Sequence, residues 1–286
     1  MKKQSADSEP LVGSEFPDDA FAEIRALLLA RRDLDLDMYK DRCLKRRIAT
    51  RIRRCGFHEA TPYIALLHRS EQEVDSLVEA LMIHVSQFFR NPSTFILLEE
   101  KILPLLINKL HAFGRSEINI WSVGCAGGEE PYSLALLLDN LDRKGLGVKI
   151  LATDLSDDII HQASQGCYEE QRLVEVPPEI LARYFVKEDR HYHLAKRIRK
   201  MVTFRQHNIL GKDLFPACDM IMCRNVMIYF SREEQENVFR RFAKALNSEG
   251  YLILGRAETL QGNTRRLFTV ESPAERIYRR TLAEAY

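Results

Sequence analysis

A strand, a glycine-rich turn and a helix start follow one another in the stretch Ile118-Asn119-Ile120-Trp121-Ser122-Val123-Gly124-Cys125-Ala126-Gly127-Gly128-Glu129-Glu130-Pro131-Tyr132-Ser133. Glycines are needed where the backbone turns tightly or lies against a ligand, because a Cβ would clash there. Two acidic residues and a proline in the first helical turn suit the positive end of the helix dipole and the fixed φ of proline. The stretch therefore predicts the ligand-binding corner of a doubly wound α/β sheet.

The acidic helix start, Glu129 and Glu130, indicates which kind of ligand suits this corner. A pyrophosphate at this helix end would be repelled by the two carboxylates. A cofactor that carries a positive amino group and free hydroxyls would not be repelled. The turn thus favours S-adenosyl-L-methionine (SAM) over a dinucleotide.

Segments of strand and helix character alternate after the turn, which predicts a mostly parallel sheet covered by helices on both faces. The segment 184–200 interrupts this alternation with short strand-like flanks around a polar turn, and we interpret it as a small inserted β-subdomain. The fold class is accordingly α/β, with residues 118–286 as the SAM-binding domain. The expected elements are strands 118–123, 148–153, 202–206, 219–223 and 251–254, helices 129–141, 156–164 and 231–247, and a hairpin from 266–270 and 276–280.

Residues 17–90 precede this domain and carry amphipathic helical patterns, which predict an N-terminal all-α bundle. Thr61 is expected to cap one of its helices and Ser70 another. The polar tail 1–16 is expected to be disordered. Residues 91–117 are expected to form a linker helix that an internal proline kinks or interrupts.

The helix expected at 37–54 is unusual because basic side chains surround a narrow apolar stripe. Arg47, Arg51 and Arg54 recur at i, i+4 and i+7, so they share one side of the helix. Such a face can be merely solvated, or it can attract an acidic partner in a way that weakens with salt.

The composition excludes several classes of partner. Lys and Arg number 42 against 41 Asp and Glu, so no global field favours nucleic acid. The six cysteines form no CxxC pair and no set with His at metal-ligand spacing, which indicates a reducing compartment and no metal site. No apolar run approaches the roughly 20 residues of a membrane span, and the first residues lack the apolar core of a signal peptide. We therefore expect a cytoplasmic protein without membrane insertion.

Polar residues follow several expected strands, where ligands bind in open α/β sheets. Asp154 can accept hydrogen bonds from both ribose hydroxyls, or it can simply cap the next helix. Asn208 can contact an adenine edge or be an ordinary turn residue. Arg224 and Asn225 end an apolar strand, a position that packing alone does not explain. Tyr229 follows them and is either a site residue or a half-buried aromatic.

Four strings occur in a fixed order along the chain: Phe88-Phe89-Arg90, Gly127-Gly128-Glu129-Glu130-Pro131-Tyr132-Ser133, Thr153-Asp154 and Cys223-Arg224-Asn225-Val226-Met227-Ile228-Tyr229-Phe230. Together they resemble the CheR family of chemotaxis receptor glutamate methyltransferases, and the resemblance extends over residues 20–260. The second and fourth strings are far more specific than a lone glycine motif.

The resemblance implies SAM-dependent methylation of glutamate side chains on the cytoplasmic helices of methyl-accepting chemoreceptors, the reaction of chemotactic adaptation. It implies SAM as cofactor, S-adenosyl-L-homocysteine as product and no metal. We expect a monomer that does not bind nucleic acid. Arg90 and Tyr229 correspond to the residues thought to orient the reacting carboxylate. The family's SAM contacts correspond to Ser86, Arg90, Glu129, Asp154, Asn208, Ile209, Arg224 and Asn225. Its receptor-docking element corresponds to the basic helix with Arg46, Arg47, Arg51, Arg53 and Arg54.

Three departures from the family pattern stand out. His84 replaces an asparagine among the cofactor contacts, and Arg256 stands in Gly255-Arg256-Ala257-Glu258 where Gly-His-Ser-Glu is common. The β excursion at 186–194 is shorter than in members that grip a receptor's C-terminal pentapeptide, and it lacks their glycine-rich turn. We therefore predict an enzyme that does not use this tether.

A glutamate substrate explains why no catalytic His or Cys is evident. Its carboxylate, with a pKa of about 4.3, is already ionised at neutral pH, so the reaction needs no general base. Two other functions are compatible with parts of the sequence. One is a nucleic-acid methyltransferase that uses the basic helix for phosphate contacts. The other is a non-catalytic module that senses SAM while docked on a receptor.

Overall fold

The computed structural model describes residues 16–32, 34, 36–81 and 86–281. Its residues form two compact units. Of the described residues, the first unit comprises those up to 81 together with Tyr229–Ser231, and the second comprises those from 86 to 228 and from 232 to 281. Within the predicted tail 1–16 only Phe16 is described, and its side chain is buried. His84 lies outside the described residues. The domain boundaries predicted at residues 90 and 117 remain proposals.

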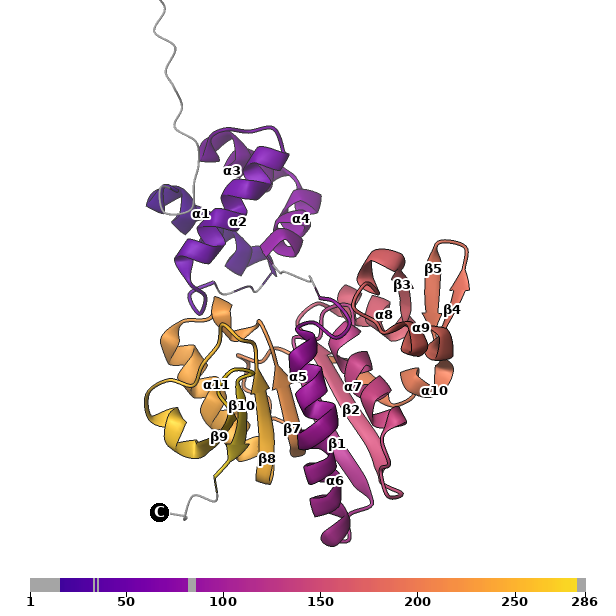
Figure 1. The fold of residues 1–286 in the computed structure, drawn as a ribbon. Helices are drawn as coiled ribbons and strands as arrows, with labels where there is room; N and C mark the ends of the chain where they lie inside the picture. Colours follow the sequence, from indigo (N-terminus) through magenta and orange to yellow (C-terminus); the bar gives the residue numbers. More distant parts are fainter. Residues whose placement is uncertain (1–15, 33, 35, 82–85, 282–286) are drawn as a thin grey trace, which may run out of the picture. The chain divides into compact units, whose positions relative to one another are not determined.

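The described part of the first unit contains four helices around one apolar core (Figure 1). Ile48, Tyr63 and Leu77 are fully shielded from solvent in this core. The predicted N-terminal all-α bundle is thus confirmed. Its helices are α1 (Asp18–Arg32), α2 (Asp41–Arg54), α3 (Ala60–Arg69) and α4 (Glu71–Leu81).

The two predicted helix caps have different outcomes. The backbone N–H of Glu73 donates to Ser70 Oγ at 3.1 Å, as the capping pattern predicted. The prediction for Thr61 was wrong, because α3 begins at Ala60 and Glu59 takes the N-cap position. A proline is tolerated anywhere in the first turn, where backbone N–H groups lack partners within the helix, so Pro62 does not force the helix to start beside it.

The second unit is built on a seven-stranded sheet with the order β6-β2-β1-β7-β8-β10-β9. β10 runs antiparallel to both of its neighbours, whereas the strands from β6 to β8 pair in parallel. This confirms the predicted α/β fold, and the C-terminal hairpin proves to be part of the main sheet. The strands are β1 (Glu117–Val123), β2 (Gly147–Asp154), β6 (Val202–Gln206), β7 (Cys218–Cys223), β8 (Leu246–Leu254), β9 (Phe268–Ser272) and β10 (Ile277–Arg280).

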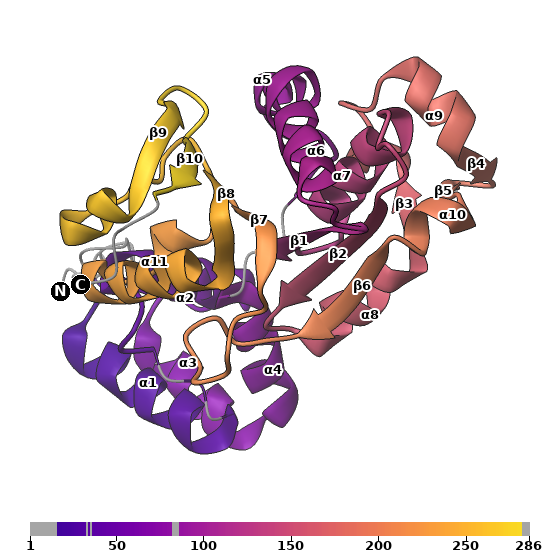
Figure 2. The ribbon, with the colours of Figure 1, turned by 90° about the horizontal axis from the view of Figure 1, so that it is seen from below.

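Helices cover both faces of this sheet, and Figure 2 shows α6 and α7 on one side with α11 on the other. Trp121 of β1 is fully buried against Phe242 of α11, with ring centroids 5.7 Å apart. On the other side, the Tyr132 hydroxyl of α7 donates to the Ala163 carbonyl of α8 at 3.1 Å. The helices are α5 (Pro92–Leu97), α6 (Leu103–Ala112), α7 (Glu129–Asn140), α8 (Asp157–Gln165) and α11 (Arg232–Ala245).

The predicted linker helix contains one π-helical turn, η2 (Leu98–Ile102), between α5 and α6. Pro104 lies just after it, at the start of α6. Proline removes one backbone N–H and crowds the preceding turn, and a wider turn accommodates both effects. The helix is therefore locally widened at the proline and continues beyond it.

A second sheet of three strands, in the order β3-β5-β4, forms the small β-subdomain. β4 (Phe185–Glu188) and β5 (His191–Leu194) make the predicted excursion. β3 (Cys167–Glu169) was not predicted, because three residues are too few to show strand periodicity. The short helices η3 (Glu170–Arg172), α9 (Pro178–Tyr184) and α10 (Lys196–Arg199) accompany this sheet.

Candidate functional site

The carboxyl ends of the parallel strands meet along one edge of the main sheet. Val123 pairs with Thr153, Ser122 with Met222, and Cys223 with Leu254, so the strands end nearly level. The chain builds the sheet outward from β1 to β2 and β6, and then returns to place β7 on the other side of β1. Ligands bind at such a reversal point, so the segments after these strands are the candidate site.

The glycine turn after β1 is constrained by close neighbours. Gly124 has φ +67°, and a Cβ there would lie 2.4 Å from a Val226 methyl carbon. Gly128 has φ +87° and takes the N-cap position of α7. The Tyr168 hydroxyl donates to the Gly127 carbonyl at 2.8 Å and holds the turn from the β3 side. Only glycine fits Gly124 without displacing its neighbours.

Asp154, at the end of β2, is hydrogen-bonded to this turn. Its Oδ2 accepts the backbone N–H of Ala126 at 2.9 Å, and its Oδ1 accepts that of Ser156 at 3.3 Å. The N-cap of α8 is Ser156, whose Oγ accepts the N–H of Ile159, so Asp154 is not the cap. The ribose contact remains the prediction for Asp154.

Glu129 opens α7 and is only 1% exposed. Its Oε1 accepts a hydrogen bond from Arg172 Nη1 at 2.9 Å. Its Oε2 is buried and finds no hydrogen-bond partner among the described residues. Burial raises the pKa of this carboxyl, and the rise is opposed by its own backbone N–H, by Arg172 and by the Ser86 side chain. A buried carboxylate oxygen without a donor is costly, so Oε2 is a place where a positive ligand group would be stabilised.

Glu130, whose side chain is 12% exposed, and the buried Arg224 form a charged cluster behind the turn. Glu130 Oε1 accepts from the Ser122 hydroxyl at 3.0 Å, and its Oε2 lies 3.7 Å from Arg224 Nη1. Burial raises the pKa of Glu130 to about 7 despite the opposing effect of Arg224. Arg224 Nη2 also donates to the Arg90 carbonyl and to Asn91 Oδ1, each at 2.7 Å. Glu130 therefore does more than start a helix, because it helps to hold the arginine that fixes the segment after Phe89.

Glu258 belongs to the site although the sequence analysis assigned it no role. Its Oε2 accepts the backbone N–H groups of Asn225 at 2.9 Å and Gly255 at 2.6 Å. The backbone N–H groups of Met227 and Ile228 also lower the pKa of Glu258, against the rise that burial causes. Asn225 has φ +62°, a conformation that this carboxylate supports. The one sequence signal was that Glu258 keeps the last position of the family's Gly-His-Ser-Glu string.

Asn208 and Ile209 follow β6 at the same edge. Asn208 is exposed, and its Oδ1 accepts the backbone N–H of Leu210 at 3.0 Å, as in an ordinary turn. Ile209 is 8% exposed. Both roles considered for Asn208 stay open, because a side chain in such a turn can still present its amide group to a ligand.

The two candidate catalytic residues belong to different units. Arg90, half-buried in the second unit, is close enough to Glu130 to lower the pKa of that carboxyl. Tyr229 belongs to the first unit, where its carbonyl accepts the backbone N–H of Lys40 at 2.8 Å. The Arg47 guanidinium lies over the Tyr229 ring, 4.3 Å from its centroid. A guanidinium over an aromatic face is attracted by the ring quadrupole, so Arg47 helps to orient this ring.

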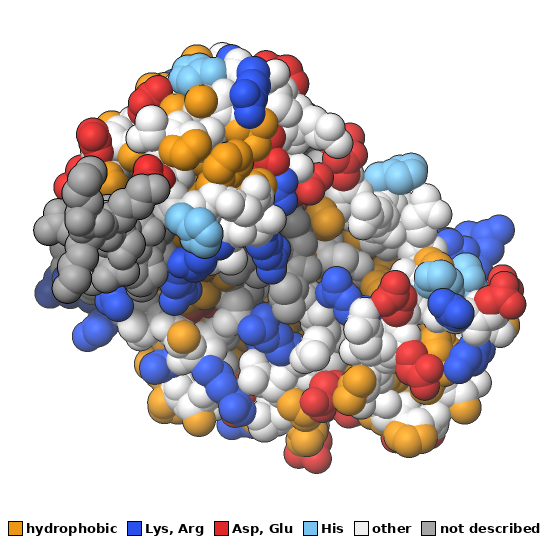
Figure 3. Space-filling model, turned by 90° about the horizontal axis from the view of Figure 1, so that it is seen from above, with side chains coloured by type: hydrophobic (Ala, Val, Ile, Leu, Met, Phe, Trp, Pro, Cys, Tyr) orange, Lys and Arg blue, Asp and Glu red, His pale blue; other side chains and the backbone are white. Residues whose placement is uncertain are grey.

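The arginines of α2 fall into two groups. Arg51 is engaged within the bundle, where its guanidinium makes two hydrogen bonds with Glu73 at 2.8 and 2.6 Å. Arg46, Arg53 and Arg54 are exposed. On the face drawn in Figure 3, basic and acidic side chains both occur, as the balanced composition requires. The docking role of these arginines remains a prediction.

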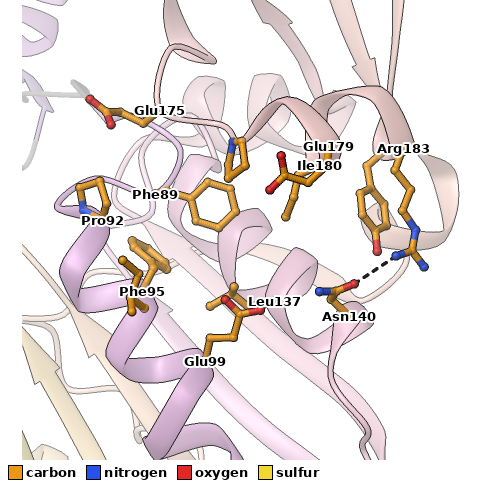
Figure 4. A pocket seen from close by; sticks show the side chains of 13 residues that line it. Phe89, Pro92, Phe95, Glu99, Leu137, Asn140, Glu175, Glu179, Ile180 and Arg183 are labelled. Carbon is orange, nitrogen blue, oxygen red and sulfur yellow. Dashed lines mark hydrogen bonds between the residues drawn. The ribbon is translucent and has the colours of Figure 1, made fainter.

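A cavity of about 300 Å³ lies in the second unit between α5, η2, α7 and α9. Figure 4 shows apolar side chains on its floor, among them Phe89 and Leu137, with the carboxylates of Glu99 and Glu179 beside them. The Arg183 guanidinium donates to Asn140 Oδ1 at 3.0 Å at one end. The glycine turn does not line this cavity, which is therefore distinct from the candidate cofactor site.

The described residues contain no group of three or more His, Cys, Asp or Glu side chains that could hold a metal ion. Within the same residues, no helix has both the length and the apolar character needed to cross a membrane.

Comparison with known proteins identifies both parts of the chain. Residues 84–276 match the model of the CheR methyltransferase SAM binding domain, and residues 19–82 match that of the CheR methyltransferase all-alpha domain. A chemotaxis protein methyltransferase of Borreliella burgdorferi is 34% identical over 80% of this chain and 84% of its own. Those of Listeria monocytogenes and Escherichia coli are 32% and 31% identical, over 81% and 87% of this chain and 87% of each relative. The structure of a SAM-bound amino pentose methyltransferase from Micromonospora echinaspora aligns over 55% of this chain and 50% of that one. The TM-score is 0.30 and the sequence identity 13%, so the similarity is distant.

Proposed function

The chain belongs to the CheR family of SAM-dependent methyltransferases, and from this premise we propose that it methylates glutamate side chains of chemoreceptors. The product would be a glutamate γ-methyl ester on a cytoplasmic receptor helix. The buried Glu129 carboxylate at the glycine turn supports the cofactor part of this proposal, because its Oε2 has no hydrogen-bond donor among the described residues. The names of the chemotaxis relatives support the receptor part.

The residues around the turn fit SAM. Gly124 and Gly128 keep the turn free of side chains, and Glu129 would accept a hydrogen bond from the ammonium group of the cofactor. We assign the ribose hydroxyls to Asp154 and the adenine edge to the segment of Asn208 and Ile209. Ser86, Arg90, Arg224 and Asn225 complete the proposed contacts, with Arg224 acting through its hold on the Arg90 carbonyl.

Methyl transfer to a glutamate carboxylate requires correct orientation of the reacting groups and no general base. SAM supplies an activated methyl group on a positively charged sulfur. A glutamate carboxylate is already ionised at neutral pH, so no protein group needs to remove a proton. Correct alignment of reacting atoms can contribute about 7–11 kcal/mol in favourable cases. We assign this alignment to Arg90, which would hold one carboxylate oxygen, and to Tyr229, which would donate to the substrate or confine the methyl end.

Helix α2 is the proposed receptor-docking surface. Its exposed arginines, Arg46, Arg53 and Arg54, would attract acidic residues on the receptor. Arg47 and Arg51 are less available for this role, because each already has a partner within the first unit. A basic surface that works through long-range attraction mainly raises the association rate, and salt screens it.

One labelling experiment tests this function. The protein is incubated with tritiated SAM and either receptor cytoplasmic fragments or RNA, and base-labile methyl esters are measured. We expect labile label in the receptor fragments. Label in RNA would instead show a nucleic-acid methyltransferase, and SAM binding without transfer to either would show a sensing module. Arg90→Ala should abolish transfer while the circular dichroism spectrum stays unchanged, whereas undiminished turnover would remove Arg90 from the mechanism.

A further inference from the structure

We propose that Arg172 recognises the carboxylate of the amino-acid end of SAM, beside the ammonium site at Glu129. This rests on the proposed cofactor site and adds a residue that the sequence analysis did not consider. Glu129 and Arg172 would then form a charge pair matched to a zwitterion, with one partner for each charge of the ligand.

Arg172 connects three segments of the second unit. It ends η3, and its Nη1 donates to the Ser86 carbonyl at 3.0 Å and to Glu129 Oε1 at 2.9 Å. Ser86 lies on the segment that leads to Arg90, and Glu129 opens α7. Arg172 therefore stands where the glycine turn, the Arg90 segment and the β-subdomain come together.

Much of the guanidinium remains available for a ligand. An arginine carries five N–H donors in a planar fork that matches a carboxylate. Both recorded hydrogen bonds of Arg172 come from Nη1, and the described residues supply no partner for Nε or Nη2. The side chain is 38% exposed, whereas that of Glu129 is 1% exposed. A ligand carboxylate can therefore approach Arg172 from the open side while the inner nitrogen keeps its bond to Glu129.

Glu129 supplies the complementary half. Its Oε2 is buried without a donor, while its Oε1 is held by Arg172. An ammonium group at Oε2 would satisfy this oxygen and add a second positive neighbour to a carboxylate whose burial disfavours its charge. The carboxylate of the same ligand would in turn balance Arg172. Each charge of the zwitterion would then meet an opposite charge that the fold already holds in place.

A purely structural role is the competing explanation, in which Arg172 only neutralises Glu129 and ties Ser86 to α7. The two explanations differ in which ligands they affect. A carboxylate contact matters only for ligands that carry the carboxylate. A structural role would affect every ligand of the site, including those without an amino-acid end.

The carboxylate contact and the purely structural role can be distinguished by measuring the affinity of the full chain for four ligands with isothermal titration calorimetry. SAM and S-adenosyl-L-homocysteine carry both charges of the amino-acid end, decarboxylated SAM lacks the carboxylate, and 5′-methylthioadenosine lacks both. For Arg172→Ala we expect a loss of about tenfold or more in affinity for the first two ligands, since hydrogen bonds between charged groups are among the strong ones. Affinity for the other two should stay within about twofold of wild type. Arg172→Lys should recover only part of the loss, because it keeps the charge but not the fork.

Arg183→Ala is the matched control, since this exposed arginine lies on the neighbouring helix α9 and bonds to Asn140. It should leave all four affinities unchanged, and thermal melts should show that both variants are folded. An equal loss for all four ligands, or no loss for SAM, would overturn the role of Arg172. Failure of the wild-type protein to bind SAM at all would instead refute the proposed cofactor site itself.

Discussion

The carboxylate of Glu258 accepts the backbone N–H of Asn225, with 2.9 Å between Oε2 and the nitrogen. The same oxygen accepts the N–H of Gly255 at 2.6 Å, so one side chain joins the segments after β7 and β8. Asn225 has a left-handed backbone conformation, which asparagine adopts more readily than most residues, and the hydrogen bond to Glu258 holds it in place. Glu258 thus shapes a proposed cofactor contact from outside the motifs that carry the family resemblance.

Glu258→Gln is expected to weaken both the fold and the cofactor site. The amide replaces one carboxylate oxygen by a donor and removes the charge that these N–H groups stabilise. Loss of hydrogen bonds to a buried charged group should lower the free energy of unfolding by about 2–3 kcal/mol, measured by urea denaturation. SAM affinity should fall as well. Glu100→Gln, at an exposed position in η2, is the control and should change stability by less than about 0.5 kcal/mol. Equal stability of the two variants would contradict this role.

The ion pair between Arg51 and Glu73 is expected to stabilise the helical unit. Glu73 also accepts the Tyr63 hydroxyl at 2.7 Å, and its side chain is only 11% exposed. Arg51→Ala would leave this carboxylate without its main partner and should cost about 2 kcal/mol, less than for a fully buried pair. Arg53→Ala, on the same helix but exposed, should cost less than about 0.5 kcal/mol. Thermal and urea denaturation of the two variants measure the difference, and similar losses would refute it.

Glu130 is expected to make stability depend on pH. Its pKa rises from 4.5 to about 7 in the folded chain, because of burial. The folded state therefore binds more protons than the unfolded state between these values. The contribution is fully present below pH 4.5 and is lost as the pH rises through 7, by about 3 kcal/mol.

The test is the difference between wild type and Glu130→Gln, which cancels the titration of other groups. The free energy of unfolding of wild type, relative to the variant, should fall between pH 4.5 and 7 and level off above. Arg224, Arg90, Ser122 and Glu258 face this group and are common to both proteins. A difference that is independent of pH would show that Glu130 is ionised throughout this range.

Receptor docking through α2 is expected to depend on salt. Replacing Arg46, Arg53 and Arg54 by Ala should raise the KM for receptor fragments several-fold at low salt, with little change in kcat, because these side chains guide encounter and not chemistry. The effect should shrink as ionic strength rises toward 0.5 M, where screening is strong. Replacing the exposed Arg240, Lys244 and Arg266 removes the same charge elsewhere and should leave KM unchanged. Equal effects of the two triple variants would reject a specific docking surface.

The receptor's C-terminal pentapeptide is expected not to serve as a tether. The hairpin of β4 and β5 turns within Glu188–His191 and has no glycine there, with Asp189 at φ +52°. Titration of the peptide by fluorescence anisotropy should show no binding in the low-micromolar range. Receptor fragments with and without the pentapeptide should be methylated at the same rate, and a faster rate with it would contradict the prediction.

Local patterns in the sequence were enough to predict the main fold. The stretch from Ile118 to Ser133 combines a strand, a glycine turn and an acidic helix start, and each depends only on neighbouring residues. The alternation of strands and helices then predicted the parallel sheet. The arginine-rich segment predicted as a helix forms α2 in the structure. The start of α3 and the short strand β3 escaped prediction, because a proline fits several first-turn positions and three residues show no period.

Only the tertiary structure decided how charged side chains pair across the chain. Arg172 meets Glu129 from 43 residues away, and Glu258 meets Asn225 from 33 residues away. From the sequence, Glu130 was interpreted only as part of a helix start. In the structure its carboxylate lies beside Arg224 with little exposure to solvent. Helical spacing predicted Arg47 and Arg51 on one face of the helix. In the structure Arg47 lies over the Tyr229 ring, whereas Arg51 is hydrogen-bonded to Glu73. Such pairings follow from which strand ends meet and from how deeply each group is buried, and neither quantity is encoded by local spacing.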